Sequence, residues 1–219
     1  MPDLNFQIEG VEPLLHAATP FLEFHLRATN SNPDEVIHAI ALRVQIQLDV
    51  TKRKYDVSDH ERLLDLFGAP DRWSQTLRAM LWTFVNVTVA PFSGTSVTKL
   101  QVPCTFDFNV AATKYFYALD DGEVPLTFLF SGTIFYEGQE GEFQVAQISW
   151  SKEAIYRMSV QVWKEMMAHY YPNIAWLALR QDVFDRLFRY KSRHGTPTWE
   201  QVFTQLLNQS LEEFKEGTE

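Results

Sequence analysis

The stretch IALRVQIQLDV, residues 40–50, decides the fold because its apolar and polar positions alternate without a break. Every even-numbered position carries Ile, Leu or Val, whereas the odd-numbered positions are mostly polar. A period of two over this length predicts a half-buried strand of an antiparallel sheet. Residues 21–28 alternate in the same way, and the turn-forming residues 30–34 separate the two stretches. The sequence therefore predicts a hairpin of these two strands.

Four more stretches have the composition of strands: residues 85–89, 99–110, 126–136 and 143–150. Pro103 interrupts the second of them, which favours an edge strand or a bulge because proline cannot donate a backbone hydrogen bond. Residues 126–136 are apolar on both faces, so this strand is expected at the centre of a covered sheet. The neighbourhood of Gly132 predicts a kink within it.

Two regions have helical patterns. An insert at about residues 58–78 opens with Ser58 and Glu61 in the spacing of a capping box, and Gly68 is placed to stop its first helix. From Ser159 to about residue 210 the apolar period becomes 3.6, with a helix expected at 176–194 and another after residue 196. Strand-rich residues 1–150 followed by helical residues 159–210 predict one α+β domain over residues 1–219, with an antiparallel sheet and C-terminal helices packed on it.

The charge balance limits the class of partner. The 219 residues carry a net charge of −9 with no run of Lys or Arg, so binding to nucleic acid or to an anionic membrane surface is not expected. A single cysteine excludes an internal disulfide and suits a reducing compartment. The first ten residues lack the pattern of a signal peptide, and no apolar run is long enough to span a bilayer. We therefore expect a cytoplasmic protein.

No catalytic or metal-binding motif is present. The six histidines form none of the HxH, HxxxH or HExxH spacings. His25 and His38 would lie close together across the predicted hairpin, but solvated turn histidines are the commoner case, and we predict no metal site. Cys104 is expected as a small inward-facing apolar residue. We predict no catalytic residue and no cofactor, which favours a protein that is not an enzyme.

Aromatic residues concentrate in the C-terminal third. Packing of the helices onto the sheet is the first interpretation, and an exposed aromatic groove for a partner is the second. Methionines nearby would suit an adaptable binding surface. The candidate partner-binding residues are Trp163, Met166, Met167, Tyr170, Tyr171 and Trp176.

Short segments along the whole chain resemble, in the same order, a bacterial family known only as a domain of unknown function. They are residues 36–43, 65–68, 102–104, 122–126 and 193–199. Members of that family are often encoded beside high-affinity nickel–iron uptake hydrogenases and their maturation genes. The resemblance implies an accessory role with a hydrogenase subunit or maturation factor as partner, and it supplies no catalytic residue.

A second resemblance is to the SecB export chaperones. It rests on the two alternating strands near the start, on residues 130–135, and on residues 171–174 before a long helix. SecB-like proteins combine an antiparallel sheet with C-terminal helices and a hydrophobic client groove. The insert at residues 52–91 departs from their pattern, which puts the likeness in doubt.

Three hypotheses about function follow. The first is a non-enzymatic accessory or assembly protein that binds another protein through an aromatic and Met-rich face. The second is an enzyme or small-molecule binder with a pocket between sheet and helices, lined by Cys104, His169 or Asp182. The third is a structural subunit or homo-oligomer, in which the strand edge at Pro103 pairs between copies.

Overall fold

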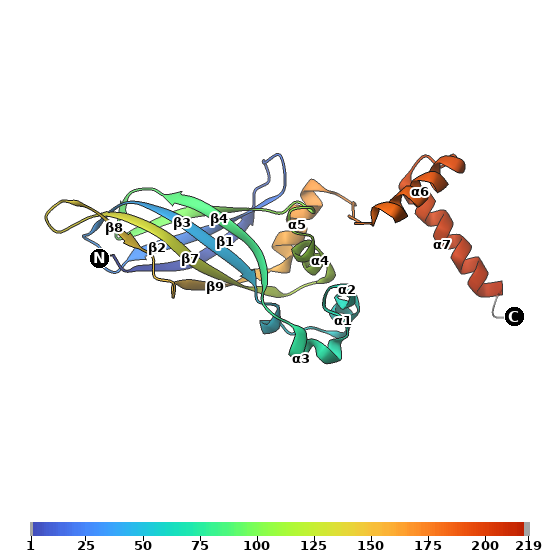
Figure 1. The fold of residues 1–219 in the computed structure, drawn as a ribbon, viewed down its shortest axis with the longest axis horizontal. Helices are drawn as coiled ribbons and strands as arrows, with labels where there is room; N and C mark the ends of the chain where they lie inside the picture. The colour runs from blue at the N-terminus through green and yellow to red at the C-terminus, as the bar shows by residue number, and fades with distance from the viewer. Residues whose placement is uncertain (1, 217–219) are drawn as a thin grey trace. The chain divides into compact units, whose positions relative to one another are not determined.

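The computed structural model describes residues 2–216, with side chains up to residue 210. The chain divides into two compact units, Met1–Ile174 and Ala175–Glu219 (Figure 1). We refer to them as the N-terminal and C-terminal units. The sequence predicts one domain over residues 1–219, which stays a prediction; the residues of the main hydrophobic core all belong to the N-terminal unit.

The N-terminal unit contains all the described strands and five α-helices. The strands are β1 (Leu4–Pro13), β2 (Phe21–Asn30), β3 (Val36–Leu48), β4 (Met80–Val89), β5 (Phe92–Ser93), β6 (Thr95–Pro103), β7 (Glu123–Glu137), β8 (Phe143–Gln147) and β9 (Glu153–Ser159). The helices are α1 (Val57–Arg62), α2 (Leu64–Phe67), α3 (Trp73–Thr76), α4 (Val110–Ala118) and α5 (Val160–Tyr170). The C-terminal unit holds α6 (Gln181–Arg193) and α7 (Trp199–Glu216).

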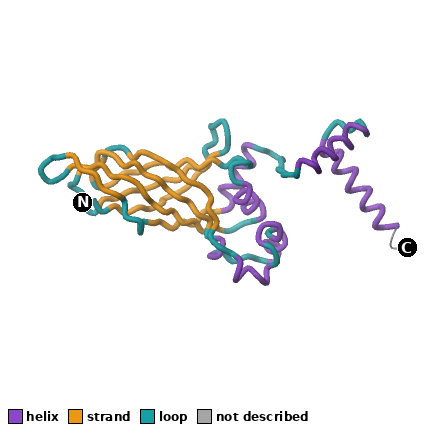
Figure 2. Tube along the Cα trace, in the orientation of Figure 1, coloured by secondary structure: helices purple, strands orange, loops and turns teal. Residues whose placement is uncertain are grey.

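The strands, drawn orange in Figure 2, form two antiparallel sheets. One sheet has the order β1-β2-β6; the other has the order β4-β3-β7-β8, with β5 also paired to β3 and β9 to β7. Phe6 of β1 stacks on Phe130 of β7 with ring centroids 4.3 Å apart, and Phe24 of β2 meets Phe128 edge-on at 5.2 Å. Side chains from the two inner faces therefore share one core. The α+β class and the antiparallel pairing are as predicted.

The predicted hairpin of the first two alternating stretches is wrong. β2 pairs with β1 and β6, whereas β3 pairs with β4, β5 and β7 in the other sheet. The alternation is confirmed around Val44 in β3, and in β2 it is broken at Glu23, which is buried beside Phe24. Alternation identifies the buried face of a strand but not the strand beside it, and here the turn crosses from one sheet to the other.

The helical insert is confirmed, but its cap is not the one predicted. α1 begins after Asp56, whose side chain accepts a hydrogen bond from the backbone N–H of Asp59, while the side chain of Asp59 accepts one from Asp56. Asp56 and Asp59 thus form the capping box two residues before the predicted pair of Ser58 and Glu61. Gly68 ends α2 with φ +72°, as its position predicts.

A helix replaces the end of one predicted strand. β6 stops at Pro103, and α4 begins at Val110 after Asn109, whose side chain accepts from the backbone N–H of Ala112. The alternation of residues 99–110 thus predicts one strand where the chain makes a strand, a turn and a helix start. A short polar N-cap outweighs a weak period-two pattern here.

The later helices also shift relative to prediction. Ser159 caps α5 as expected, its hydroxyl accepting from Gln161 N–H. The next helix begins at Gln181 rather than at Trp176, and residues 175–180 are not helical. None of the described helices combines the length and apolar composition that crossing a membrane requires.

Candidate protein-docking site

Three of the candidate partner-binding residues lie inside the N-terminal unit. Trp163 is 2% exposed, and Met166 and Met167 are also buried on the inner face of α5. The Trp163 ring stacks on Phe116 of α4 at 5.2 Å and meets Tyr117 edge-on at 4.9 Å. The interpretation as an exposed groove is therefore wrong for these three side chains, whose role is core packing between helix and sandwich.

Tyr170 and Tyr171 end α5 and are half-buried. The Tyr170 hydroxyl donates to the Leu14 carbonyl oxygen at 2.5 Å and accepts from the Ala17 backbone N–H at 3.1 Å. It holds the loop between β1 and β2 against α5. Tyr170 is thus engaged within the unit, and its hydroxyl is not free to contact a partner.

Trp176 belongs to the C-terminal unit and is 46% exposed. Trp176 is the first of several large exposed apolar side chains in this unit, and others lie on both of its helices. Phe188 is 54% exposed and Leu207 64% exposed. The exposure of Trp176 fits the second interpretation, an exposed aromatic surface, rather than packing in a core, and its part in partner binding stays a prediction.

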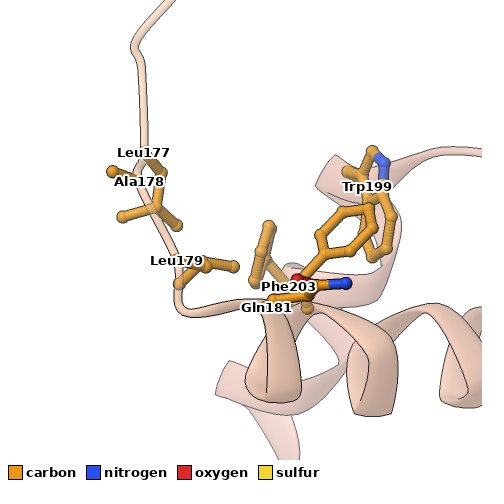
Figure 3. Close-up of a pocket in the computed structure, with 7 residues that line it drawn as sticks. Leu177, Ala178, Leu179, Gln181, Trp199 and Phe203 are labelled. Carbon is orange, nitrogen blue, oxygen red and sulfur yellow. The ribbon is translucent and has the colours of Figure 1, made fainter.

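An apolar groove of about 560 Å³ lies within this unit, and we call it the aromatic groove. Figure 3 shows Leu177 and Leu179 on an extended segment facing Trp199 and Phe203. The complete lining is Leu177, Ala178, Leu179, Gln181, Phe184, Trp199 and Phe203. Gln181 is the one polar side chain of this lining, so the groove offers apolar contact with almost no directional hydrogen bonding.

The aromatic rings of the groove form one contiguous group. Phe184 lies with its ring centroid 5.5 Å from Trp199 and 6.3 Å from Phe188, and Trp199 lies 6.3 Å from Phe203. The Lys191 ammonium sits 5.8 Å from the Trp199 ring and donates to the Pro197 carbonyl oxygen at 2.9 Å. These contacts fix the start of α7 beside the end of α6.

The groove arises from sequence signals that are visible in hindsight. Phe184 and Phe188 are four residues apart, and so are Trp199 and Phe203. Such pairs share one helix face. The sequence predicts a helix at residues 176–194, but no side chain of α6 is buried. The period of a helix predicts its apolar face, and not whether another element covers that face.

Two residues of the pocket hypothesis, Cys104 and His169, lie in the N-terminal unit. Cys104 is buried at the end of β6, where burial raises its thiol pKa to about 12, so it is a poor nucleophile near neutral pH. The recess beside it measures about 10 Å³, too small for a substrate. His169 is exposed on α5, and its Nε2 lies 3.1 Å from the Leu15 carbonyl oxygen.

Asp182 lies in the other unit, on α6. It is exposed and binds Arg180 through two hydrogen bonds of 2.9 and 2.6 Å, which lower the pKa of its carboxyl group. A carboxylate that is paired in solvent is held ionised, unlike a general acid. The structure thus gives no support to a catalytic role for this residue.

One cluster has the residue types of a metal site. A ligand atom from each of Glu12, Glu23 and His25 lies within 4.8 Å of the others. The Lys99 ammonium, however, lies 2.5 Å from the buried Glu23 carboxylate and lowers its pKa. A cation of the chain itself therefore occupies the cluster. His38 is not part of it, because it lies in the other sheet and stacks on Phe143 at 5.9 Å.

Comparison with solved structures gives only distant likenesses. At 11% identity the chain matches the CARDB domain of a Pyrococcus furiosus protein in complex with di-metal ions (72% of this chain, 92% of that chain, TM-score 0.29). Also at 11% it matches a putative late embryogenesis abundant protein (73% and 72%, TM-score 0.33) and the putative ApaA protein from Bordetella pertussis (72% and 93%, TM-score 0.26). TM-scores this low carry no argument about fold or function.

The search of curated proteins gave no match. A family model does match, over residues 1–215, and its description is a family of unknown function, DUF6084. A match over nearly the whole length includes both units and the aromatic groove. The chain therefore belongs to the family of unknown function DUF6084.

Proposed function

We propose that this chain is a non-enzymatic accessory protein that binds another protein through the aromatic groove of its C-terminal unit. The observation that supports this most is a contiguous set of rings in which Phe184 and Phe188 are exposed and Trp199 and Phe203 are half-buried. Large exposed apolar patches are rare on soluble monomers and commonly mark interfaces. Trp and Phe anchors of this kind also dominate binding energies at interfaces.

A protein partner fits this groove better than a small molecule does. A ligand pocket needs a few convergent polar groups that fix the orientation of the ligand, and Gln181 is the one polar side chain in the lining. The apolar surface also continues beyond the groove to Phe188 and Leu207. A helix laid across these faces would cover the rings together.

The resemblance to a family encoded beside nickel–iron uptake hydrogenases makes a hydrogenase subunit or maturation factor the first partner to test. The accessory role and the cytoplasmic location are parts of the same proposal.

The experiment is capture of purified hydrogenase large subunit, small subunit and maturation factors on the immobilised full chain. We expect one of them to bind, and the double substitution Trp199→Ala/Phe203→Ala to weaken that binding by about tenfold or more, as for anchor residues. Phe143→Ala is the matched control, because Phe143 is an exposed aromatic of β8 in the other unit. It should leave binding unchanged.

Two outcomes would count against the proposal. Binding that survives the double substitution and is lost with Phe143→Ala would move the docking site to the sandwich. If the protein binds unfolded polypeptides of any kind equally well through the groove, a chaperone-like role would replace the specific accessory role. A thermal unfolding curve of each variant confirms that the sandwich is intact.

A further inference from the structure

β8 is the last strand of its sheet. The order β4-β3-β7-β8 places β7 on one side of β8 and no described strand on the other. The Gly138 backbone N–H donates to the Glu142 carbonyl oxygen, and the Ile148 N–H donates to the Gly132 carbonyl oxygen. Hydrogen-bonded and non-hydrogen-bonded pairs alternate in an antiparallel ladder. The backbone groups of even-numbered residues in β8 therefore face β7, and those of odd-numbered residues face outward.

Three residues of β8 offer backbone donors and acceptors to an incoming strand: Phe143, Val145 and Gln147. Their side chains are exposed as well, and no backbone hydrogen bond to another described segment occupies this edge. A row of unpaired N–H and C=O groups is a template for a further strand. Proteins that bind extended peptides use such an edge for affinity and nearby side-chain pockets for specificity.

A cavity of about 760 Å³ at one end of β8 is strongly acidic, and Gln144 of β8 is part of its lining. Hydrogen bonds from its own backbone N–H and from that of Glu140 lower the pKa of the Glu142 carboxyl group, which keeps it ionised. A Lys or Arg side chain placed here would meet opposite charge. Among the described residues that line the cavity none is Lys or Arg, and five are carboxylates: Asp34, Glu35, Glu137, Glu140 and Glu142.

A smaller cavity at the other end of β8 is mainly apolar. It measures about 230 Å³ and lies where the start of β1 meets the end of β8, and Figure 1 shows β8 and the N-terminus at the same end of the N-terminal unit. Leu4, Ile134 and Ile148 supply its apolar lining, and the ion pair of Lys152 with Asp3 also borders it. An apolar side chain of a partner can use such a cavity as an anchor point.

We propose that the outer edge of β8 binds an extended basic segment of a partner protein, which adds to the sheet as a strand. A Lys or Arg side chain of this segment lies at the acidic cavity, and a large apolar side chain fills the apolar cavity. Because the cavities lie at opposite ends of β8, these two side chains are about five residues apart, or roughly 17 Å along an extended chain.

Charge selects this occupant over a second copy of the same strand. Residues 137–149 contain no Lys or Arg, so β8 of a second copy has no basic side chain to offer the acidic cavity. The inference goes beyond the proposed function and does not use the aromatic groove, which belongs to the C-terminal unit.

The first test is fluorescence anisotropy of labelled peptides with the full chain. Two peptides of alternating Thr and Val carry one Arg and one Leu about five residues apart, in either order, to cover both strand directions. We expect one of them to bind, and Val145→Pro to weaken that binding at least about tenfold, since proline removes an outward N–H and spares the ladder to β7. Val145→Thr keeps the N–H and is the matched control, with binding unchanged within about twofold.

The second test needs no variant, so it decides the matter even if Val145→Pro fails to fold. Residue-resolved hydrogen–deuterium exchange of the native full chain is measured with and without saturating peptide. We expect exchange of the outward amides of Phe143, Val145 and Gln147 to slow at least about tenfold, because a paired amide exchanges only when the added strand opens. Unchanged exchange at these three amides, or equal binding of the peptide to folded Val145→Pro, would overturn the inference.

Two further outcomes would overturn the choice of occupant. A peptide with Glu in place of Arg should bind at least about tenfold more weakly, and equal binding of the two peptides would show that the acidic cavity selects nothing. A dimer in sedimentation that Val145→Pro dissociates would make a second copy the occupant.

The inference and the proposed function fail separately. Loss of peptide binding at β8 leaves capture of a hydrogenase component through Trp199 and Phe203 untouched. Absence of any such capture, with peptide binding at β8 intact, would overturn the proposed function and support the inference alone.

Discussion

Trp163→Ala will lower the free energy of unfolding of the N-terminal unit by about 3–5 kcal/mol, the range for removing a large buried aromatic side chain. The Trp163 indole is 2% exposed and lies between Phe116 and Tyr117. Alanine would leave a cavity at the junction of α4, α5 and the sandwich, where the surrounding side chains are fully packed. Urea unfolding followed by circular dichroism at a strand wavelength measures this change.

The matched control is Trp176→Ala, which removes the same side chain from a surface position. We expect a change in stability of about 0.5 kcal/mol or less, as for surface substitutions in general. A similar loss of stability in the two variants would contradict the assignment of Trp163 to the core and of Trp176 to the surface. The comparison also separates folding from docking, since only the second variant reports on the exposed aromatic surface.

Gly132→Ala is expected to destabilise the protein by about 4 kcal/mol. Gly132 lies in the middle of β7 with φ +142°, a conformation that costs other residues about 1–3 kcal/mol. A Cβ atom there would lie 2.1 Å from the backbone oxygen of Ala41 in the neighbouring strand β3. Relieving that clash requires the two central strands to separate, which adds about 1–3 kcal/mol.

Gly132 lies at the point where β7 changes its strand partner. β7 pairs with β8 through residues 133–137 and with β9 through residues 123–129, and Gly132 lies between the two. Its carbonyl oxygen accepts from the Ile148 backbone N–H at 2.9 Å. The long strand thus changes partner where glycine allows it to bend.

Gly68→Ala is the control for backbone strain alone. Gly68 also has positive φ, +72°, but a Cβ atom there would meet nothing within 4 Å. We expect a loss of about 1–3 kcal/mol, because φ +72° with ψ −161° is a backbone conformation that essentially only glycine adopts. Denaturant unfolding of both variants tests the difference, and an equal loss for the two would show that the contact with Ala41 does not matter.

The sequence predicts the individual strands better than their arrangement. The alternation of residues 40–50 and the apolar run of residues 126–136 correspond to β3 and β7, which pair at the centre of one sheet. The same kind of pattern fails to show that β2 belongs to the other sheet, because partner choice depends on contacts distant in sequence. The strands β1 and β9 were not predicted, and both pair along the edges of strands that were.

The sequence predicts that an aromatic surface exists, but it does not predict which residues form that surface. Helical spacing of aromatic residues is the same for Trp163, which is buried, and for Phe184, which is exposed. What distinguishes them is whether a second element covers the helix face: α4 and the sandwich cover α5, and no element within the C-terminal unit covers α6 fully. The SecB-like and hydrogenase-related expectations stay predictions, since they depend on clients and genes rather than on the fold.

The most direct measurement is hydrogen–deuterium exchange of the full chain, diluted until sedimentation shows only monomer. If α6 and α7 depend on another protein for their packing, their amides will exchange at least about 100-fold faster than those of β3 and β7, since local stability follows buried contacts. With a saturating amount of the hydrogenase subunit or maturation factor that the chain captures, the same amides should become protected, and Trp199→Ala/Phe203→Ala should abolish that gain. Protection of α6 and α7 in the monomer as strong as that of β7 would contradict a docking role for the C-terminal unit.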